Sequence, residues 1–275
     1  MEKLKKKKNV INRDTSVSWA LHALKNVLGY EDIRKKIIKK YYPDIDNSKY
    51  IRTFDATVSY TPTNYKEKYS EKVNDIINYC KSVMNLPGYV VFTATNIEEY
   101  RDETQEKDNE THYQMFIVDN ENHKLYAIDP ALKPGNKKGI YVPQVALDII
   151  NPFFKKNGYK THFIQLTNPA QTDNSEEHAD VFCQSWTLYI LFEVLKKKHG
   201  NDFKDIDINI PKDQLERYKI LLQFYKNLLK TVPSIKKILN EEYVSELNEY
   251  KPHGYNELKE LKASRIIMSI TPEEL

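Results

Sequence analysis

The sequence predicts an α+β fold, with a small mixed sheet packed on the helix that begins at Cys183 and further helices at both ends. Three observations lead to this prediction. Two apolar runs flank a polar turn at 119–122 and predict a β-hairpin over 111–129. An apolar run follows Cys183 and ends in lysines and Gly200, which is typical of a buried helix. From Pro211, a residue well placed at a helix start, the rest of the chain is helical.

Local periodicity and turn residues define the remaining elements. In chain order we expect a helix over 14–29, a short helix over 31–41, an irregular Tyr-rich loop over 43–65, a helix over 66–84, a strand over 89–94, a charged exposed segment over 97–111, the hairpin, a loop over 130–139, a helix over 140–154, a strand over 158–166, the Cys183 helix, and helices over 211–231, 234–249 and 255–264. Cys80 falls in the apolar stripe of its helix, which predicts an inert core residue.

We expect three segments: a basic tail over 1–13, a main domain over 14–200 and a helical extension over 201–275. The tail contains the run from Lys3 to Lys8, which favours a solvated segment. A weak nucleic-acid contact, nuclear targeting or contact with an acidic surface is the alternative interpretation.

The hairpin predicts that a carboxylate lies against an imidazole. With the turn centred on 119–122, Val118 faces His123 and, further along, His112 faces Asp129. Residues directly opposite each other share a face, with Cβ atoms about 5 Å apart. A carboxylate in that place holds a histidine base in one tautomer and stabilises it once it is protonated.

Cys183 supplies the third group. A cysteine at a helix N-terminus feels the positive end of the helix dipole, which lowers a thiol pKa, and the backbone N–H groups there can help to hold an oxyanion. Asp180 is the candidate N-cap. Taken singly, a cysteine in an apolar helix is more often a core residue and a histidine on a strand is more often structural. Together, His112, Asp129 and Cys183 predict the catalytic triad of a thiol hydrolase.

These residues resemble the ubiquitin-like-protein-specific cysteine proteases, the clan of the SUMO proteases and the adenovirus maturation protease with its giant-virus counterparts. The resemblance is carried by His112-Tyr-x-x-x-x-Ile-Val-Asp, by the aspartate seventeen residues after His112 and by the later cysteine on a helix, and it covers about 88–199. It implies that His112 is the base, Asp129 its orienting partner and Cys183 the nucleophile. The family usually has Trp after the histidine, where Tyr113 stands here.

The oxyanion site departs from the family pattern. Gln184 stands where the family usually has Gly, and Glu177 occupies the position of the family's oxyanion glutamine. An ionised carboxylate cannot donate a hydrogen bond. Gln171, earlier in the same loop, and Gln184 are therefore the candidate side-chain donors, and Gln171 is preferred because it precedes the nucleophile. The alternative interpretation is that both are ordinary solvated loop or helix residues.

The resemblance implies hydrolysis of peptide or isopeptide bonds in a protein substrate, with no metal or organic cofactor. Its substrate would be a ubiquitin-like modifier or a viral structural polyprotein. The Lys-, Asn-, Ile- and Tyr-rich composition suggests an AT-rich genome, which fits a large DNA virus and also many cellular parasites. The alternative is a catalytically inactive protein that keeps the protease-like fold for a binding or structural role.

Composition excludes several other classes. Only 7 glycines occur in 275 residues and no Walker-type or dinucleotide fingerprint is present. A net charge of +3 argues against a globally basic nucleic-acid binder. Two cysteines without a C-x-x-C pair disfavour a disulfide framework and a cysteine-type zinc site, and predict a reducing setting such as the cytoplasm, the nucleus or a virion. The sequence shows no signal-peptide core and no apolar run near 18 residues, so we expect neither secretion nor a membrane span.

Overall fold

The structure is a computed structural model that describes residues 15–41, 53–60, 65–101, 107–131, 145–171, 182–197, 203 and 206–274. Within these ranges the side chains of residues 31, 53–73, 95–112 and 145–148 lie outside the description. The basic tail, including Lys3 to Lys8, lies outside the described residues as well.

The described elements are α1 (Ser16–Gly29), α2 (Glu31–Tyr41), β1 (Thr53–Tyr60), α3 (Tyr65–Met84), β2 (Tyr89–Arg101), β3 (Lys107–Asp119), β4 (Lys124–Ile128), α4 (Val145–Lys156), β5 (Lys160–Phe163), β6 (Gln165–Leu166), α5 (Cys183–Lys197), β7 (Asp207–Ile208), α6 (Gln214–Thr231), α7 (Pro233–Tyr250), α8 (Tyr255–Lys259), α9 (Ala263–Ser269) and a terminal 3-10 turn (Pro272–Glu274).

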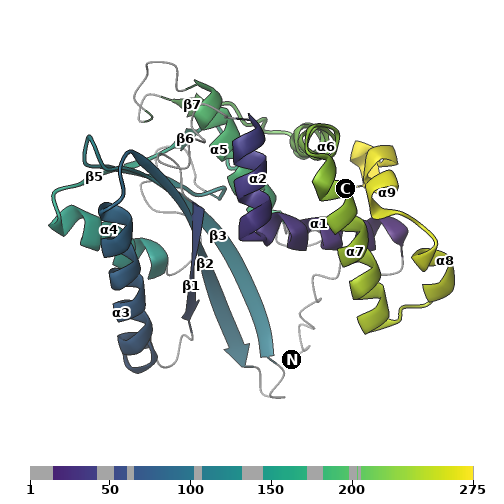
Figure 1. The fold of residues 1–275 in the computed structure, drawn as a ribbon, viewed down its shortest axis with the longest axis horizontal. Helices are drawn as coiled ribbons and strands as arrows, with labels where there is room; N and C mark the ends of the chain where they lie inside the picture. Colours follow the sequence, from purple (N-terminus) through teal and green to yellow (C-terminus); the bar gives the residue numbers. More distant parts are fainter. Residues whose placement is uncertain are drawn as a thin grey trace, which may run out of the picture.

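A mixed sheet stands at the centre, with the strand order β1-β2-β3-β4-β5. The β1/β2 and β4/β5 pairs are parallel, whereas the pairs that β3 makes with β2 and with β4 are antiparallel. Helices α3 and α4 cover one face, and α1, α2 and α5 lie on the other side of the sheet, followed by α6 to α9 (Figure 1). The predicted α+β class is confirmed, with its small mixed sheet packed on the helix that carries Cys183.

Alternate residues of β3 divide between two cores, because successive side chains of a strand point to opposite faces. Met115 and Ile117 belong to the core that contains α1 and α5. Phe116 and Val118 belong to the core beneath α3 and α4. Both faces of the sheet are therefore buried at this part of β3, and the strand is continuously apolar from Met115 to Val118 for this reason.

The chain between 53 and 60 corrects one prediction. We expected an irregular loop over 43–65, but Thr53–Tyr60 forms β1, which pairs in parallel with β2 from Thr53↔Val91 to Tyr60↔Glu98. Of the rest of the expected loop, Tyr65 is the first residue of α3, and 43–52 and 61–64 lie outside the described residues. Strand β2 runs on to Arg101 and pairs with β3 to its end, so 97–101 and 107–111 of the charged segment form the far part of a long antiparallel ribbon, while 102–106 lie outside the described residues.

Three other boundaries differ from the expected ones. The predicted strand over 158–166 is split at Ile164 into β5, which pairs with β4, and β6, which pairs with β7. Helix α6 begins at Gln214 rather than at Pro211, because the Asp213 side chain caps it by accepting a hydrogen bond from the Glu216 N–H. The predicted helix over 255–264 is two helices, α8 and α9.

The C-terminal helices share a core with the N-terminal helix. Helix α1 packs against α7 and α9, and the apolar stripe of α6 is buried at Leu221, Leu222, Tyr225, Leu228 and Leu229. These five residues belong to the core. Leu215, at the start of the same stripe, is exposed.

A polar joint adds to the contact between α1 and α7. Glu246 is buried and its Oε1 lies 2.7 Å from His22 Nδ1. The Tyr30 hydroxyl donates to Glu242 Oε2 at 2.7 Å, and this bond to a carboxylate raises the pKa of Tyr30 to about 12. Because these partners are more than 200 positions apart in the chain, the joint ties the N-terminal helix to the C-terminal extension.

Candidate active site

The β3–β4 hairpin has a different register from the one expected. The observed pairs run from Met115↔Ile128 to Asp119↔Lys124, and the same register continues to place Gln114 opposite Asp129. His112 stands two positions further along β3. The prediction that His112 directly faces Asp129 is therefore wrong by two residues. Side chains of a strand alternate between the two faces, so a shift of two residues leaves His112 on the same face of the sheet as Asp129. His112 is then diagonal to Asp129 instead of directly opposite it.

Side-chain hydrogen bonds explain why the turn falls at 120–123. Asp119 Oδ1 accepts from the Asn122 N–H at 3.1 Å, a local bond that closes the turn after β3. The Asn120 side chain donates to the carbonyl oxygens of Val83 and Leu86 at the end of α3. His123 takes a left-handed conformation with φ of 51°. The partners of Asn120 lie outside the hairpin, so the hairpin's own sequence does not reveal those two bonds.

Asp129 follows the last residue of β4 and is 2% exposed. Its Oδ2 accepts a hydrogen bond from Gln114 Nε2 at 2.9 Å, and its Oδ1 accepts one from the Ala131 N–H at 3.0 Å. Both donors are local to the hairpin and its exit, and Gln114 is itself 1% exposed. The carboxylate is therefore buried and fixed in orientation, as a group that must hold a histidine has to be.

Gln114 is the site residue that the sequence reasoning missed. It lies two residues after His112, on the strand position opposite Asp129. A turn placed at 120–123 would have paired the two residues directly. His112 lies in β3, where its backbone pairs with Asn96 of β2. Its imidazole lies outside the described side chains, so the triad stays a prediction.

Cys183 is the first residue of α5 and is 3% exposed. Lys196 and Lys197 occupy the last turn of this helix, where cations suit the helix dipole, and no acidic residue stands in the first turn beside the thiol. Thr187 Oγ1 donates to the carbonyl oxygen of Cys183 at 2.9 Å. The predicted position of Cys183 at a helix start is confirmed, while Asp180, its expected N-cap, lies outside the described residues.

Cys80 lies in a different environment, as its sequence pattern predicted. It is fully buried in the core beneath α3 and α4. Burial raises the pKa of its thiol to about 12, so it stays protonated near neutral pH. Neither cysteine forms a disulfide in the described structure.

Gln171 lies close to the exit of β4. Its backbone N–H donates to the carbonyl oxygen of Pro130 at 2.9 Å, and the Ala170 N–H donates to the same oxygen at 2.8 Å. The side chain of Gln171 is buried, with 8% exposed. The segment that leads towards Cys183 is thus attached to the residue that follows Asp129.

Gln184 lies against α1 instead. A Cβ atom at Gly29 would be 3.5 Å from the Gln184 Oε1 atom and 3.6 Å from its Nε2 atom. That Oε1 is buried and has no hydrogen-bond partner among the described residues. Glu177, which occupies the family's oxyanion position, lies outside the described residues.

The described residues contain no group of three or more His, Cys, Asp or Glu side chains arranged to hold a metal ion. Within the same residues, no helix is both long enough and apolar enough to cross a membrane.

Comparison with known proteins finds no matching family model and no matching curated relative. Among solved structures, the chain is similar to ChlaDub1 from Chlamydia trachomatis, with 15% identity, 76% of this chain and 95% of that chain covered, and a TM-score of 0.40. It is also similar to the Legionella pneumophila effector protein RavZ, with 10% identity, 86% and 89% covered, and a TM-score of 0.33. RavZ in complex with human LC3B matches with 12% identity, 77% and 68% covered, and a TM-score of 0.31. At these values the likeness carries no conclusion about activity.

Proposed function

We propose that the protein is a cysteine peptidase that hydrolyses peptide or isopeptide bonds, with Cys183 as nucleophile, His112 as general base and acid, and Asp129 as the group that orients His112. The observation that carries this proposal is the buried carboxylate of Asp129, which Gln114 and Ala131 hold at the end of β4. A carboxylate fixed in this way, on the strand next to that of His112, is what a histidine base needs.

The three groups would meet at the end of the sheet. Helix α5 packs on the face of the sheet to which Met115 belongs. Gln114, which donates to Asp129, is the adjacent residue of β3, so its side chain points to the other face. Cys183 therefore cannot reach Asp129 through the sheet, and in the proposed triad it approaches around the end of β4. The bonds from Ala170 and Gln171 to Pro130 support this route, because they hold the segment before α5 beside that end.

The carboxylate of Asp129 can take part in several hydrogen bonds at once. An ionised carboxylate has about four acceptor positions, and Gln114 and Ala131 are two of the donors to Asp129. The diagonal register also suits His112, because diagonal neighbours on adjacent strands have Cβ atoms about 7 Å apart, within reach of a long or aromatic side chain.

In the proposed reaction the Cys183 thiolate attacks the carbonyl carbon of the scissile bond and forms a tetrahedral intermediate. His112 gives its proton to the leaving amine, the C–N bond breaks, and a thioester remains on Cys183. His112 then takes a proton from water, the hydroxide attacks the thioester, and the product carboxylic acid leaves as Cys183 regains its thiolate. Asp129 stabilises the imidazolium at each stage.

We propose Gln171 as the side-chain donor to the oxyanion, beside the backbone N–H of Cys183. The attachment of Gln171 to Pro130 places it near Asp129, whereas the amide of Gln184 lies against Gly29. The family resemblance adds the substrate class, a ubiquitin-like modifier or a viral structural polyprotein. The two cysteines without a C-x-x-C pair favour a reducing compartment as the place of action. We propose 14–200 as the catalytic domain and 201–275 as a helical extension.

Electrophilic substrate probes test the activity and the substrate class together. The full chain is incubated with ubiquitin, SUMO and LC3B that each carry a C-terminal vinyl sulfone, and adducts are measured by intact-mass spectrometry. We expect one probe to form a stoichiometric adduct on Cys183, and Cys183→Ala and His112→Ala to form none, whereas Cys80→Ala reacts like the parent chain. Equal reaction of the parent and Cys183→Ala would contradict the assignment of the nucleophile.

A second candidate function is a non-catalytic binding or structural protein. Both oxygens of Asp129 are already bonded within the hairpin and its exit, as they would be in a carboxylate that only closes a strand end. A small thiol reagent separates the two candidates. A peptidase should be alkylated far faster at Cys183 than at Cys80, whereas slow labelling of both thiols at similar rates would favour the binding protein.

A further inference from the structure

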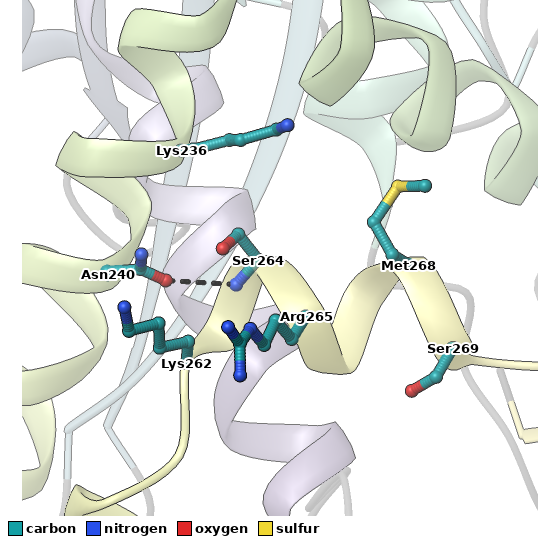
Figure 2. A pocket seen from close by; sticks show the side chains of 7 residues that line it. All are labelled: Lys236, Asn240, Lys262, Ser264, Arg265, Met268 and Ser269. Atoms are coloured by element: carbon teal, nitrogen blue, oxygen red, sulfur yellow. Dashed lines mark hydrogen bonds between the residues drawn. The ribbon is translucent and has the colours of Figure 1, made fainter.

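A pocket lies between α7 and α9, and none of the predicted triad or oxyanion residues lines it. Its volume is about 530 Å³, which is within the usual range for small-molecule sites. Figure 2 shows the side chains that surround it, which come from α7, from the residue before α9 and from α9 itself: Lys236, Asn240, Lys262, Ser264, Arg265, Met268 and Ser269.

The lining is positively charged. Lys236, Lys262 and Arg265 contribute three cations, and no acidic side chain lines the pocket. Among the described residues, none of these three cations takes part in an ion pair. Like charges gathered around one hollow repel each other, and a bound anion relieves that repulsion.

Neighbouring cations have partners, which sets the pocket apart. Lys237, next to Lys236 on α7, lies 3.7 Å from Glu241 Oε1. Lys226 of α6 donates to the carbonyl oxygen of Ile270, directly after α9. These two neighbouring lysines therefore have partners, whereas no ion pair involves Lys236, Lys262 or Arg265 among the described residues.

The framework of the pocket is held in place. The Ser264 N–H donates to Asn240 Oδ1 at 3.0 Å and so joins the start of α9 to α7, as Figure 2 shows. Ala263 and Ile267 of α9 are fully buried in the core that α1 shares. Ser264 itself is 7% exposed. A site on packed helices presents its donors with little loss of conformational freedom.

We propose that this pocket binds a small phosphorylated anion, through the Arg265 guanidinium and the charges of Lys262 and Lys236. The planar fork of arginine matches two phosphate oxygens, and each lysine adds a point charge. The hydroxyl of Ser264 is a further donor at the same wall, and Met268 offers an apolar surface to the organic part of the ligand. This proposal is independent of the peptidase proposal.

Titration calorimetry of the full chain with inorganic phosphate and with pyrophosphate tests the site. We expect saturable binding, tighter for pyrophosphate, that Arg265→Gln and Lys262→Gln each weaken roughly ten- to hundredfold. Lys237→Gln is the matched control, because it removes the same charge from a neighbouring position whose partner is Glu241. Its affinity should stay within about twofold of the parent, and all variants should keep the parent's melting temperature.

Sedimentation with vesicles shows whether the phosphate group belongs to a lipid headgroup or to a soluble molecule. Phosphatidylcholine vesicles with and without phosphatidic acid are sedimented with the protein. Binding to the acidic vesicles that pyrophosphate displaces identifies a lipid headgroup, and binding of soluble pyrophosphate alone identifies a free phosphorylated molecule. The proposal is overturned if the parent chain binds neither source, or if Lys237→Gln loses as much affinity as Arg265→Gln.

Discussion

Replacing Gln114 by leucine should destabilise the protein through Asp129. Leucine has nearly the same volume but no donor, so the buried carboxylate loses its bond from Nε2 and keeps the one from Ala131. Because both partners are at most 2% exposed, water cannot take the place of the lost donor. Hydrogen bonds to charged groups contribute about 1.5–3 kcal/mol, so we expect the free energy of unfolding to fall by about 2 kcal/mol.

Gln165→Leu is the control. It removes a 3.0 Å bond from Gln165 Nε2 to the neutral carbonyl of Phe163, at a half-buried position. A neutral bond contributes about 0.5–1.5 kcal/mol, so this change should cost clearly less. Urea unfolding followed by circular dichroism measures both variants under identical conditions.

A double-mutant cycle with Asp129→Ala isolates the interaction energy between Gln114 and Asp129. If the bond is as the structure shows, Gln114→Leu should cost little once Asp129 is alanine, with a coupling energy of about 1–2 kcal/mol. In the active enzyme Gln114→Leu should lower kcat while KM changes little, because it disturbs the orientation of the triad and not substrate binding. A coupling energy below about 0.3 kcal/mol would refute this account of how Asp129 is held.

The remaining predictions concern the thiols, the triad carboxylate and the oxyanion donor. Cys183→Ala should abolish hydrolysis with little change in melting temperature, whereas Cys80→Ala should cost about 1 kcal/mol of packing and leave hydrolysis intact, as activity assays and thermal melts will show. Since burial raises the pKa of Cys80 to about 12, its alkylation should stay slow at pH 7–9 and accelerate only as the pH approaches that value. Asp129→Asn should leave a small residual turnover. Gln171→Ala should lower kcat about 100- to 1000-fold with KM roughly unchanged, and a silent Gln171→Ala beside a severe Gln184→Ala would move the donor to Gln184.

The helix starts that were predicted correctly depend on residues close to them in the sequence. Helix α1 starts at a capped residue, since Thr15 Oγ1 accepts from the Ser18 N–H. Helix α5 starts at Cys183, after a polar stretch and at the beginning of an apolar run. Caps, periodicity and Gly or Pro stops act within a few residues, so they can be read from the chain alone.

The missed features depend on distant contacts. Strand β1 exists because it pairs with β2, about 38 positions further along the chain, and its own sequence resembles a Tyr-rich loop. The hairpin register is set by the bonds from Asn120 to the end of α3, which move the turn by one residue and the pairing by two. For the site, the sequence indicated Asp129 and Cys183, but it could not show that Gln114 is the donor to Asp129.

The pH dependence of Cys183 alkylation tests the proposed site most directly, because it needs no knowledge of the substrate. Iodoacetamide labelling is followed by peptide mass spectrometry from pH 5 to pH 10, in the parent chain and in His112→Ala. If His112, Asp129 and Cys183 form one site, the parent should react well below pH 7, and His112→Ala should shift the profile towards the ordinary thiol pKa of about 8.5. Identical profiles in the two proteins, or a parent Cys183 that is as unreactive as Cys80, would contradict the proposed triad.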